Sequence, residues 1–261
     1  MISAMLWDVD GTLAETERDG HLQAFNLAFS SLGVPWRWST ERYGELLAVA
    51  GGRERLLHDM QSQSQAPADR REREALAERI HRLKNRLYAD IVARGDLSLR
   101  PGVRELLQDC AQASVRVGIV TTTSRSNVEA LLDMHLGPDW ESTFAVVICA
   151  EDAPKKKPDP QAYLLALDAL QVLPHETVAI EDAPAGVAAA QAAGVPVIVA
   201  RSHYFNSVPC AGVLAAGPSL GRIEAWNPPA DPRVSRIDLA QINRWHSHRR
   251  RALTAAARPE D

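Results

Sequence analysis

Short apolar runs that alternate with helical patterns constrain the fold of this chain more than any other feature. From about Pro101 onward the runs cover residues 115–120, 144–148, 178–180 and 195–199, and Gly, Pro or polar turns bound each of them. Continuous apolar runs of this length are typical of buried strands in a parallel sheet. With a first run over residues 2–9, the series predicts an α/β fold, a doubly wound parallel sheet of Rossmann-like type.

The stretch 15–95 interrupts this alternation, because it carries helical patterns and no convincing strand. We expect an inserted, all-helical domain there, between two parts of one core domain, 1–14 and 96–225. Two helical faces are apolar, and their residues are Leu22, Phe25, Phe29 and Leu32 on one, and Leu76, Ile80, Leu83, Leu87 and Ile91 on the other. The charged residues from Arg70 to Arg86, paired at i,i+4, are expected to face water.

The segment 226–261 changes character again. Two proline-containing turns precede a helical pattern over 237–251, and Arg and His cluster there; the arginines are Arg244, Arg249, Arg250, Arg251 and Arg258. Such a cluster could bind an acidic partner. A frayed C-terminal tail, partly helical or disordered, fits the composition better.

Composition excludes several classes of protein. A net charge of -4 gives no global reason to expect nucleic-acid binding. Cys110, Cys149 and Cys210 lack metal-binding spacing and are typical of buried thiols in a reducing compartment. The first residues lack signal-peptide features, and no apolar run approaches the length of a membrane span. We expect a cytoplasmic protein, a monomer, with neither nucleic-acid nor membrane partners.

Two carboxylates, Asp8 and Asp10, stand two positions apart at the end of the first apolar run, before Gly11. On an extended segment residues i and i+2 project from the same face, so this pair can converge on one metal ion or one phosphate. A solvated turn after a strand uses the same residue types. The pair alone therefore leaves both interpretations open.

Three further polar features follow, each at a predicted strand end or loop: Thr121 to Ser124, Lys157-Pro158 and Glu181-Asp182. Each alone is also typical of a solvated loop or a helix cap. Because ligands of parallel sheets gather at the carboxyl ends of the strands, we expect these features to converge on the aspartates. The combination is that of a phosphoryl-transfer site.

Charge suggests the chemical roles. Asp8, ionised at neutral pH, would be the nucleophile, and a divalent metal must screen its repulsion of a phosphate. Mg²⁺ prefers hard oxygen ligands, here Asp8, Asp182 and the backbone carbonyl of Asp10, with Glu181 as a further candidate.

Lys157 and the Thr121 hydroxyl would contact the transferring oxygens. Asp10 would protonate the leaving oxygen and later activate water. Crowding by carboxylates and loss of water would supply its proton by raising its pKa.

In this order, Asp8-Val9-Asp10-Gly11-Thr12, Thr121, Lys157 and Glu181-Asp182 resemble the four motifs of the haloacid dehalogenase superfamily, over residues 1 to about 210. The helical insertion resembles a type 1 cap of that family. Further segments are similar to the CbbY-type phosphatases, namely 15–21, 43–47, 51–55, 136–138 and 155–160. The resemblance implies a Mg²⁺-dependent phosphatase that forms an aspartyl-phosphate. Its implied substrate is a small phosphorylated sugar, xylulose-1,5-bisphosphate, a Rubisco inhibitor that it converts to xylulose 5-phosphate.

A bisphosphate needs a second anion site in the cap. Gly51-Gly52 at a helix start, with Arg53 and Arg55 nearby, would offer free amides and guanidinium groups, although Gly51 could equally end a helix. Glu17 and His21 resemble family positions that face the substrate, although His21 could instead pack against the first cap helix. The candidate substrate-binding residues are Glu17, His21, Tyr43, Gly51, Gly52, Arg53, Arg55 and Thr122.

Two positions depart from the family pattern: Arg53 stands where Lys is common, and Ala183 where Ser is common. Other functions are also compatible with the motifs. They are a β-phosphoglucomutase-like isomerase, a phosphoglycolate phosphatase, a regulatory protein on an inactive phosphatase scaffold and, with least support, a glycosyltransferase. Release of inorganic phosphate in each turnover separates phosphatase from isomerase.

Overall fold

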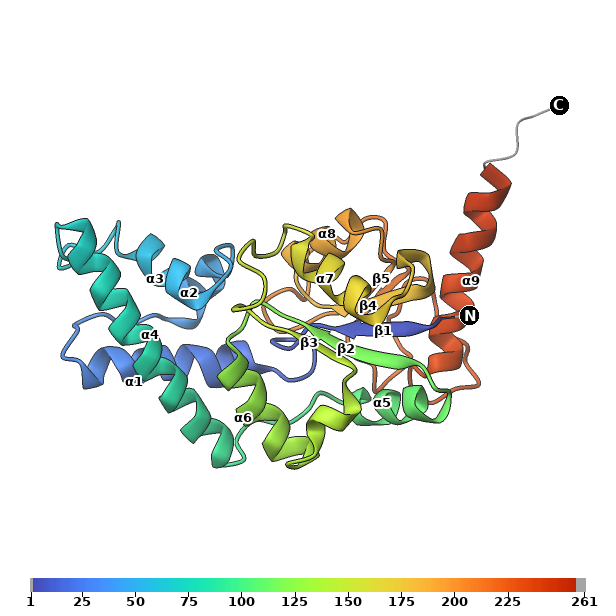
Figure 1. Cartoon of the computed structure of the whole chain (residues 1–261), viewed down its shortest axis with the longest axis horizontal. Helices are drawn as coiled ribbons and strands as arrows, with labels where there is room; N and C mark the ends of the chain where they lie inside the picture. The colour runs from blue at the N-terminus through green and yellow to red at the C-terminus, as the bar shows by residue number, and fades with distance from the viewer. Residues whose placement is uncertain (1, 257–261) are drawn as a thin grey trace.

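A six-stranded parallel sheet forms the centre of the molecule in the computed structural model, which describes residues 2–256 (Figure 1). The strand order is β3-β2-β1-β4-β5-β6, and every neighbouring pair is parallel. The strands are β1 (Ala4–Trp7), β2 (Arg116–Val120), β3 (Val146–Ile148), β4 (Thr177–Glu181), β5 (Val197–Ala200) and β6 (Ala215–Gly217). The predicted α/β class is confirmed, and the sequence had given no sign of β6.

Helices cover both faces of the sheet because successive strand residues point to opposite sides. Met5 and Trp7 pack on one face with helices α5, α6 and α9, whereas Ala4 and Leu6 pack on the other with α7 and α8. The helices of this part are α5 (Val103–Gln112), α6 (Arg125–Leu136), α7 (Gln161–Leu170), α8 (Pro184–Ala192) and α9 (Leu239–Ala256), with short 3₁₀ turns η2 (Trp140–Thr143) and η3 (Pro174–Glu176).

The segment between β1 and α5 forms a helical layer at one end of the molecule (Figure 1). It has a hydrophobic cluster of its own, centred on Phe25, Phe29, Trp38 and Tyr43. Its elements are the π-helical turn η1 (Glu17–His21), α1 (Leu22–Ser31), α2 (Thr40–Leu46), α3 (Gly52–Asp59) and α4 (Arg70–Ala93). We call this layer the cap; the exact limits given above for core and cap stay predictions.

The C-terminal segment is packed rather than frayed over its first part. Ile237, Ile242 and Trp245 are buried in the same cluster as the sheet, and Trp245 stacks on Trp226 with ring centroids 5.2 Å apart. Proline-rich composition concealed this apolar face of α9. The remainder of the predicted tail, 257–261, lies outside the described residues.

Among residues 2–256, no helix combines the length and apolar character that a membrane crossing requires.

Candidate active site

Lys157 joins three of the predicted motifs at the carboxyl edge of the sheet. Its Nζ lies 2.8 Å from Asp8 Oδ1, 2.6 Å from Glu181 Oε1 and 2.8 Å from the carbonyl oxygen of Val120. The strand order explains the meeting, because β1 lies between β2 and β4 and the residues after all three strands share one edge. The structure thus brings together side chains that are up to 149 positions apart along the chain.

Three buried carboxylates, of Asp8, Glu181 and Asp182, have oxygens within 4.8 Å of one another. Burial raises the pKa of Asp8 to about 8 against the opposing charge of Lys157, and Glu181 adds repulsion. Burial also raises the pKa of Asp182, with repulsion from Asp8 and Glu181. Ionised together, the three carboxylates would exceed the charge of one ammonium, and a divalent cation with oxygen ligands would stabilise that ionised state. The donor set therefore fits a metal ion.

Two glycines make room for these carboxylates. Gly11 has φ +83°, and a Cβ there would lie 2.2 Å from Asp182 Oδ2. Gly186, in the first turn of α8, would place a Cβ 2.1 Å from the carboxyl carbon of Glu181. Any larger residue at either position would displace a member of the acidic cluster.

Tyr163 and Arg100 support the site, and the sequence interpretation missed both. The Tyr163 hydroxyl donates to Glu181 Oε1 at 2.6 Å, so Glu181 is held by both a phenol and an ammonium. The Arg100 guanidinium donates to the carbonyls of Gly11 and of Ala200, the latter at 2.7 Å. It fixes the loop after β1 against the end of β5.

Asp10 faces the cap. Its Oδ1 accepts hydrogen bonds from the Thr16 hydroxyl at 2.5 Å and from His21 Nε2 at 2.8 Å. Burial alone would raise the pKa of Asp10, but the charge and hydrogen bond of His21, with the Thr16 bond, hold it below its usual range. The expected rise through carboxylate crowding is therefore wrong, because the Asp10 carboxylate is paired with cap residues. No feature of the sequence around Thr16 had predicted its contact with Asp10.

His21 is buried and stacks on Tyr88, with ring centroids 4.2 Å apart. It contacts Asp10 through Nε2, so packing and polar contact occur together. His21 therefore packs against α4 rather than against the first cap helix, and its contact with the substrate stays a prediction.

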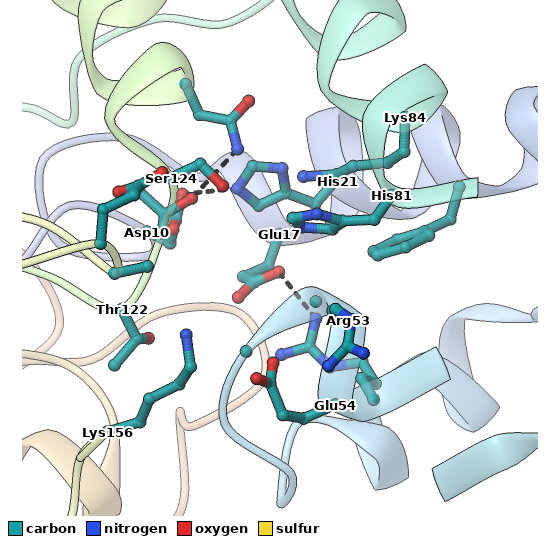
Figure 2. A pocket seen from close by; sticks show the side chains of 18 residues that line it. Asp10, Glu17, His21, Arg53, Glu54, His81, Lys84, Thr122, Ser124 and Lys156 are labelled. Carbon is teal, nitrogen blue, oxygen red and sulfur yellow. Dashed lines mark hydrogen bonds and ion pairs between the residues drawn. The ribbon is translucent and has the colours of Figure 1, made fainter. Parts of the chain in front are cut away.

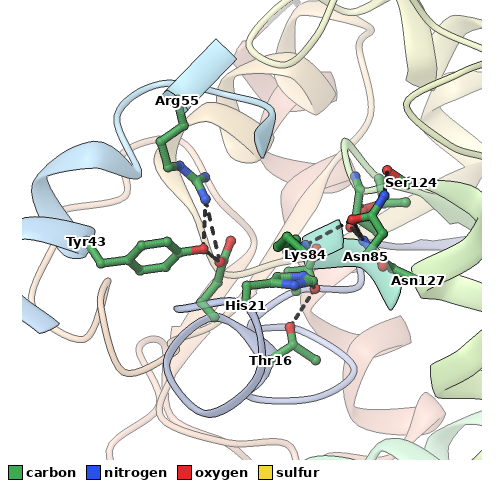
Figure 3. Close-up of polar contacts among 12 residues, drawn as sticks. Thr16, His21, Tyr43, Arg55, Lys84, Asn85, Ser124 and Asn127 are labelled. Atoms are coloured by element: carbon green, nitrogen blue, oxygen red, sulfur yellow. Dashed lines mark hydrogen bonds and ion pairs between the residues drawn. The ribbon is translucent and has the colours of Figure 1, made fainter. Parts of the chain in front are cut away.

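Tyr43 lies behind Glu17 rather than in a cavity. Its hydroxyl donates to Glu17 Oε2 at 2.5 Å and accepts from Arg55 Nη1 at 2.8 Å (Figure 3). Tyr43 is fully buried, whereas Glu17 and Arg55 line the cavities beside the acidic cluster. Tyr43 thus contacts two side chains of the cavity walls, and its predicted contact with the substrate stays a prediction.

Two adjoining cavities meet at this edge, with volumes of about 70 Å³ and about 220 Å³. The smaller is lined by the acidic cluster, Lys157 and Thr121. The larger lies between cap and core and is shown in Figure 2. Four predicted residues line both, namely Asp10, Glu17, Arg55 and Thr122. A molecule with two anionic ends would reach from one cavity to the other.

The larger cavity, which we call the cap cavity, is lined by charges of both signs. Its cations are Arg53, Arg55, Lys84 and Lys156, and its carboxylates are Asp10, Glu17, Glu54 and Glu151 (Figure 2). Gly51 and Gly52 also line it, and α3 begins at Gly52, so Gly51 does not end a helix. Arg53 Nε lies 3.6 Å from Glu78 Oε2, so this cation already has a carboxylate partner.

Lys84 corrects the expectation that the charged residues of 70–86 face water. It is buried, and its Nζ lies 5.3 Å from the ring centroid of Phe25 and 5.2 Å from that of Tyr88. Burial lowers the pKa of Lys84 to about 8, although Asp10 and Glu17 oppose the shift. A pattern of i,i+4 charges could not reveal that one of them faces a cavity between two layers.

Known proteins resemble this chain over most of its length. A model of haloacid dehalogenase-like hydrolases matches residues 2–194. Protein CbbY of Cupriavidus necator is 38% identical over 253 residues, which are 94% of this chain and 97% of that protein. Protein CbbY of Cereibacter sphaeroides is 41% identical over 212 residues, 81% of this chain and 90% of that protein. The crystal structure of a mutant CbbY from Rhodobacter sphaeroides in complex with xylulose-(1,5)bisphosphate superposes with a TM-score of 0.80, at 38% identity, over 86% of this chain and 97% of that chain.

Proposed function

This chain belongs to the haloacid dehalogenase-like hydrolases and is a sugar-phosphate phosphatase, and we propose that it dephosphorylates xylulose-1,5-bisphosphate in a Mg²⁺-dependent reaction. The observation that supports this substrate best is the pair of cavities. One holds the nucleophile and the acidic cluster with Lys157, and the wall of the other carries four cations besides four carboxylates. A sugar with a phosphate at each end would place one phosphate beside Lys157 and the other against the cations of the cap cavity.

Asp8 is the proposed nucleophile, and it attacks phosphorus to form an aspartyl-phosphate. A Mg²⁺ ion held by Asp8, Asp182 and the main-chain carbonyl of Asp10, with Glu181 beside them, would offset the repulsion between nucleophile and phosphate. Lys157, fixed by three acceptors, presents a second positive charge at the nucleophile. Thr121 and Thr122 line the same space and can donate hydroxyl hydrogen bonds to the transferring oxygens.

Asp10 is the proposed acid and base. The hydrogen bond from His21 keeps its carboxylate ionised, which is the state that activates the attacking water. Before that step Asp10 must carry a proton to the leaving sugar oxygen. His21 is a protonatable partner in direct contact with it, and both groups belong to a cavity wall that the substrate would reach.

The cap would recognise the second phosphate. Lys84 and Arg53 come from the cap, and Lys156 comes from the loop that also carries Lys157 (Figure 2). Phosphate contacts from guanidinium and ammonium groups are stronger than neutral hydrogen bonds. Substrates with one phosphate would lose these contacts, so we expect them to be poorer.

The test is release of inorganic phosphate from four substrates, with and without Mg²⁺. They are xylulose-1,5-bisphosphate, ribulose-1,5-bisphosphate, phosphoglycolate and β-glucose-1-phosphate. We expect the highest kcat/KM for xylulose-1,5-bisphosphate and loss of activity when Mg²⁺ is chelated. A strong preference for phosphoglycolate would refute the substrate, and interconversion of sugar phosphates without phosphate release would favour an isomerase. The cytoplasmic location and monomeric state stay predictions.

A further inference from the structure

A second large cavity lies beside α9, at the opposite end of the molecule from the cap (Figure 1). Its volume is about 1,090 Å³, and three segments line it: 212–214, 228–233 and the residues of α9 between 241 and 249. All of these residues follow position 194, where the match to the hydrolase family ends. None of them lines either cavity of the candidate active site. We call this cavity the α9 groove.

One wall of the α9 groove is apolar. Val213, Leu214, Pro228, Pro229 and Trp245 contribute to it. The Trp245 ring is fixed by stacking on Trp226, at an interplanar angle of 26°. Pro228 and Pro229 are exposed, so this apolar surface is open to a ligand. A flat apolar group would bury it without any rearrangement of the backbone.

The other lining residues carry an excess of positive charge. Arg233, Arg244 and Arg249 face a single carboxylate, Asp231, which leaves two positive charges in excess. Asp231 is already shared, at 2.7 Å from Arg233 Nη2 and 2.9 Å from Arg244 Nη1. His248 is a further titratable group of the lining.

Two of these guanidinium groups have N–H donors that can bind a ligand. Arg249 Nη1 donates to the neutral carbonyl of Gly212 at 2.5 Å, and within residues 2–256 Arg249 forms no ion pair with a carboxylate. The Arg244 side chain is 42% exposed, and its guanidinium is shared between Asp231 Oδ2 and Gln241 Oε1. An anionic ligand in the groove would add charge-assisted hydrogen bonds to the exposed N–H groups of both arginines.

We propose that the α9 groove binds a small amphipathic anion. Its flat apolar body would lie against Pro228, Pro229 and Trp245, and its carboxylate, sulfonate or phosphate group would bind Arg244 and Arg249. The volume is that of a site for a small organic ligand, and the charge excess selects the sign of the polar end. A second copy of the chain is a poorer occupant, because a symmetric contact would bring two positively charged linings together.

The probe for this proposal is 8-anilinonaphthalene-1-sulfonate, which combines aromatic rings with one sulfonate and fluoresces when it leaves water. The full chain is titrated without inorganic phosphate, and the variants described next separate binding at the α9 groove from binding at the active site. We expect one saturable site. N-phenyl-1-naphthylamine, which lacks the sulfonate, should bind about tenfold more weakly, because it forms no charge-assisted hydrogen bond. Equal affinity for the two probes would overturn the proposal.

Variants locate the bound probe. Arg249→Gln removes the unpaired charge, and Val213→Asp places a carboxylate in the apolar wall; each should raise the Kd of the sulfonate about tenfold. Arg222→Gln is the matched control, since Arg222 is exposed and does not line the α9 groove. Its Kd should equal that of the wild type. The thermal midpoints of all three variants are compared so that loss of folding is recognised.

Two results would contradict the α9 groove as a ligand site. One is an unchanged Kd for both groove variants, or an equal loss in the Arg222→Gln control. The other is a ligand-free dimer in sedimentation that Val213→Asp converts to a monomer, because the groove would then be a subunit interface. Phosphatase activity should be unaffected by the groove variants, whose side chains lie outside the catalytic cavities.

Discussion

The acidic cluster of the core and the cations of the cap cavity differ in how their charges are held. In the core, Asp8 and Glu181 share Lys157 Nζ at 2.8 and 2.6 Å, and β1 and β4 fix their backbones. In the cap, Lys84 lies over two aromatic rings, with Asn85 Oδ1 at 3.4 Å as its polar contact. The cluster is therefore built for one reaction geometry. The cap cavity supplies charge that a bound anion can use.

This difference predicts that core variants affect the chemical step, whereas variants of the cap cavity affect substrate binding. A change in the core should lower kcat, because the core groups are the ones proposed to act on the transferring phosphoryl group. A change to a cation of the cap cavity should act on KM for a bisphosphate and leave monophosphate hydrolysis nearly unchanged. The contrast is tested by the following variants.

Asp8→Asn should have the largest effect, a fall in kcat of at least about a thousandfold, because an amide cannot form the aspartyl-phosphate. The measurement is phosphate release at saturating xylulose-1,5-bisphosphate. Asp168→Asn makes the same chemical change at an exposed position of α7 and should keep full activity. Folding of both variants is checked by circular dichroism. A fully active Asp8→Asn enzyme would contradict the assignment of the nucleophile.

Lys84→Met should lower kcat/KM for the bisphosphate about a hundredfold, mainly through KM, because a buried ammonium–phosphate contact is lost. Arg82→Met, on an exposed position of the same helix, is the control and should change little. In the wild type KM should rise above about pH 8, where Lys84 loses its proton, while KM of the variant should stay nearly flat there. An equal loss for monophosphates would place Lys84 in the chemistry rather than in recognition.

The core site could be predicted from the sequence because parallel strands bring their carboxyl ends to one edge. Asp8 follows an apolar run, Glu181 ends one, and Lys157 lies in a loop beside that edge. In the structure the ammonium of Lys157 contacts both carboxylates. Their supports could not be predicted. Tyr163 lies on an ordinary amphipathic helix, and Gly186 lies in an alanine-rich one, so neither differs locally from a packing residue.

The cap was harder to predict because its functional residues depend on which way each helix turns relative to the core. Lys84 has the sequence context of a solvated charge, yet α4 directs it into the cavity. The apolar face of α9 was likewise obscured by the prolines and arginines around it. Periodicity identifies helices, but it does not state which polar residue meets another layer.

Asp59 tests whether the cap is held together as firmly as the core site. Its carboxylate accepts from Trp38 Nε1 at 2.7 Å and from Arg42 Nη2 at 2.6 Å. Asp59→Asn should lower the free energy of unfolding by about 2 kcal/mol, because a charged acceptor of several hydrogen bonds is replaced by an amide. Glu45→Gln removes the exposed partner of Arg42 and should cost at most about 0.5 kcal/mol.

The pH dependence of the same contact has a defined sign. Burial of Asp59 is outweighed by its hydrogen bonds from Trp38 and Arg42, so its pKa in the folded protein is lowered. Its stabilisation is fully present above the unfolded pKa of about 4 and is lost as the pH falls further. Urea unfolding should therefore separate wild type from Asp59→Asn at neutral pH, and the difference should shrink at about pH 3. A constant difference would assign the loss to packing.

Lys156→Met should have the smallest effect, and it compares two neighbouring lysines. Lys156 lines the cap cavity, whereas Lys155 is exposed and outside it. We expect KM for the bisphosphate to rise about tenfold in Lys156→Met, with kcat unchanged, and no change in Lys155→Met. Because Lys156 comes from the core loop that also carries Lys157, this result would extend recognition across the boundary between core and cap. Equal effects of the two substitutions would mean that Lys156 acts only through long-range electrostatic attraction. Added salt should then abolish its effect on KM.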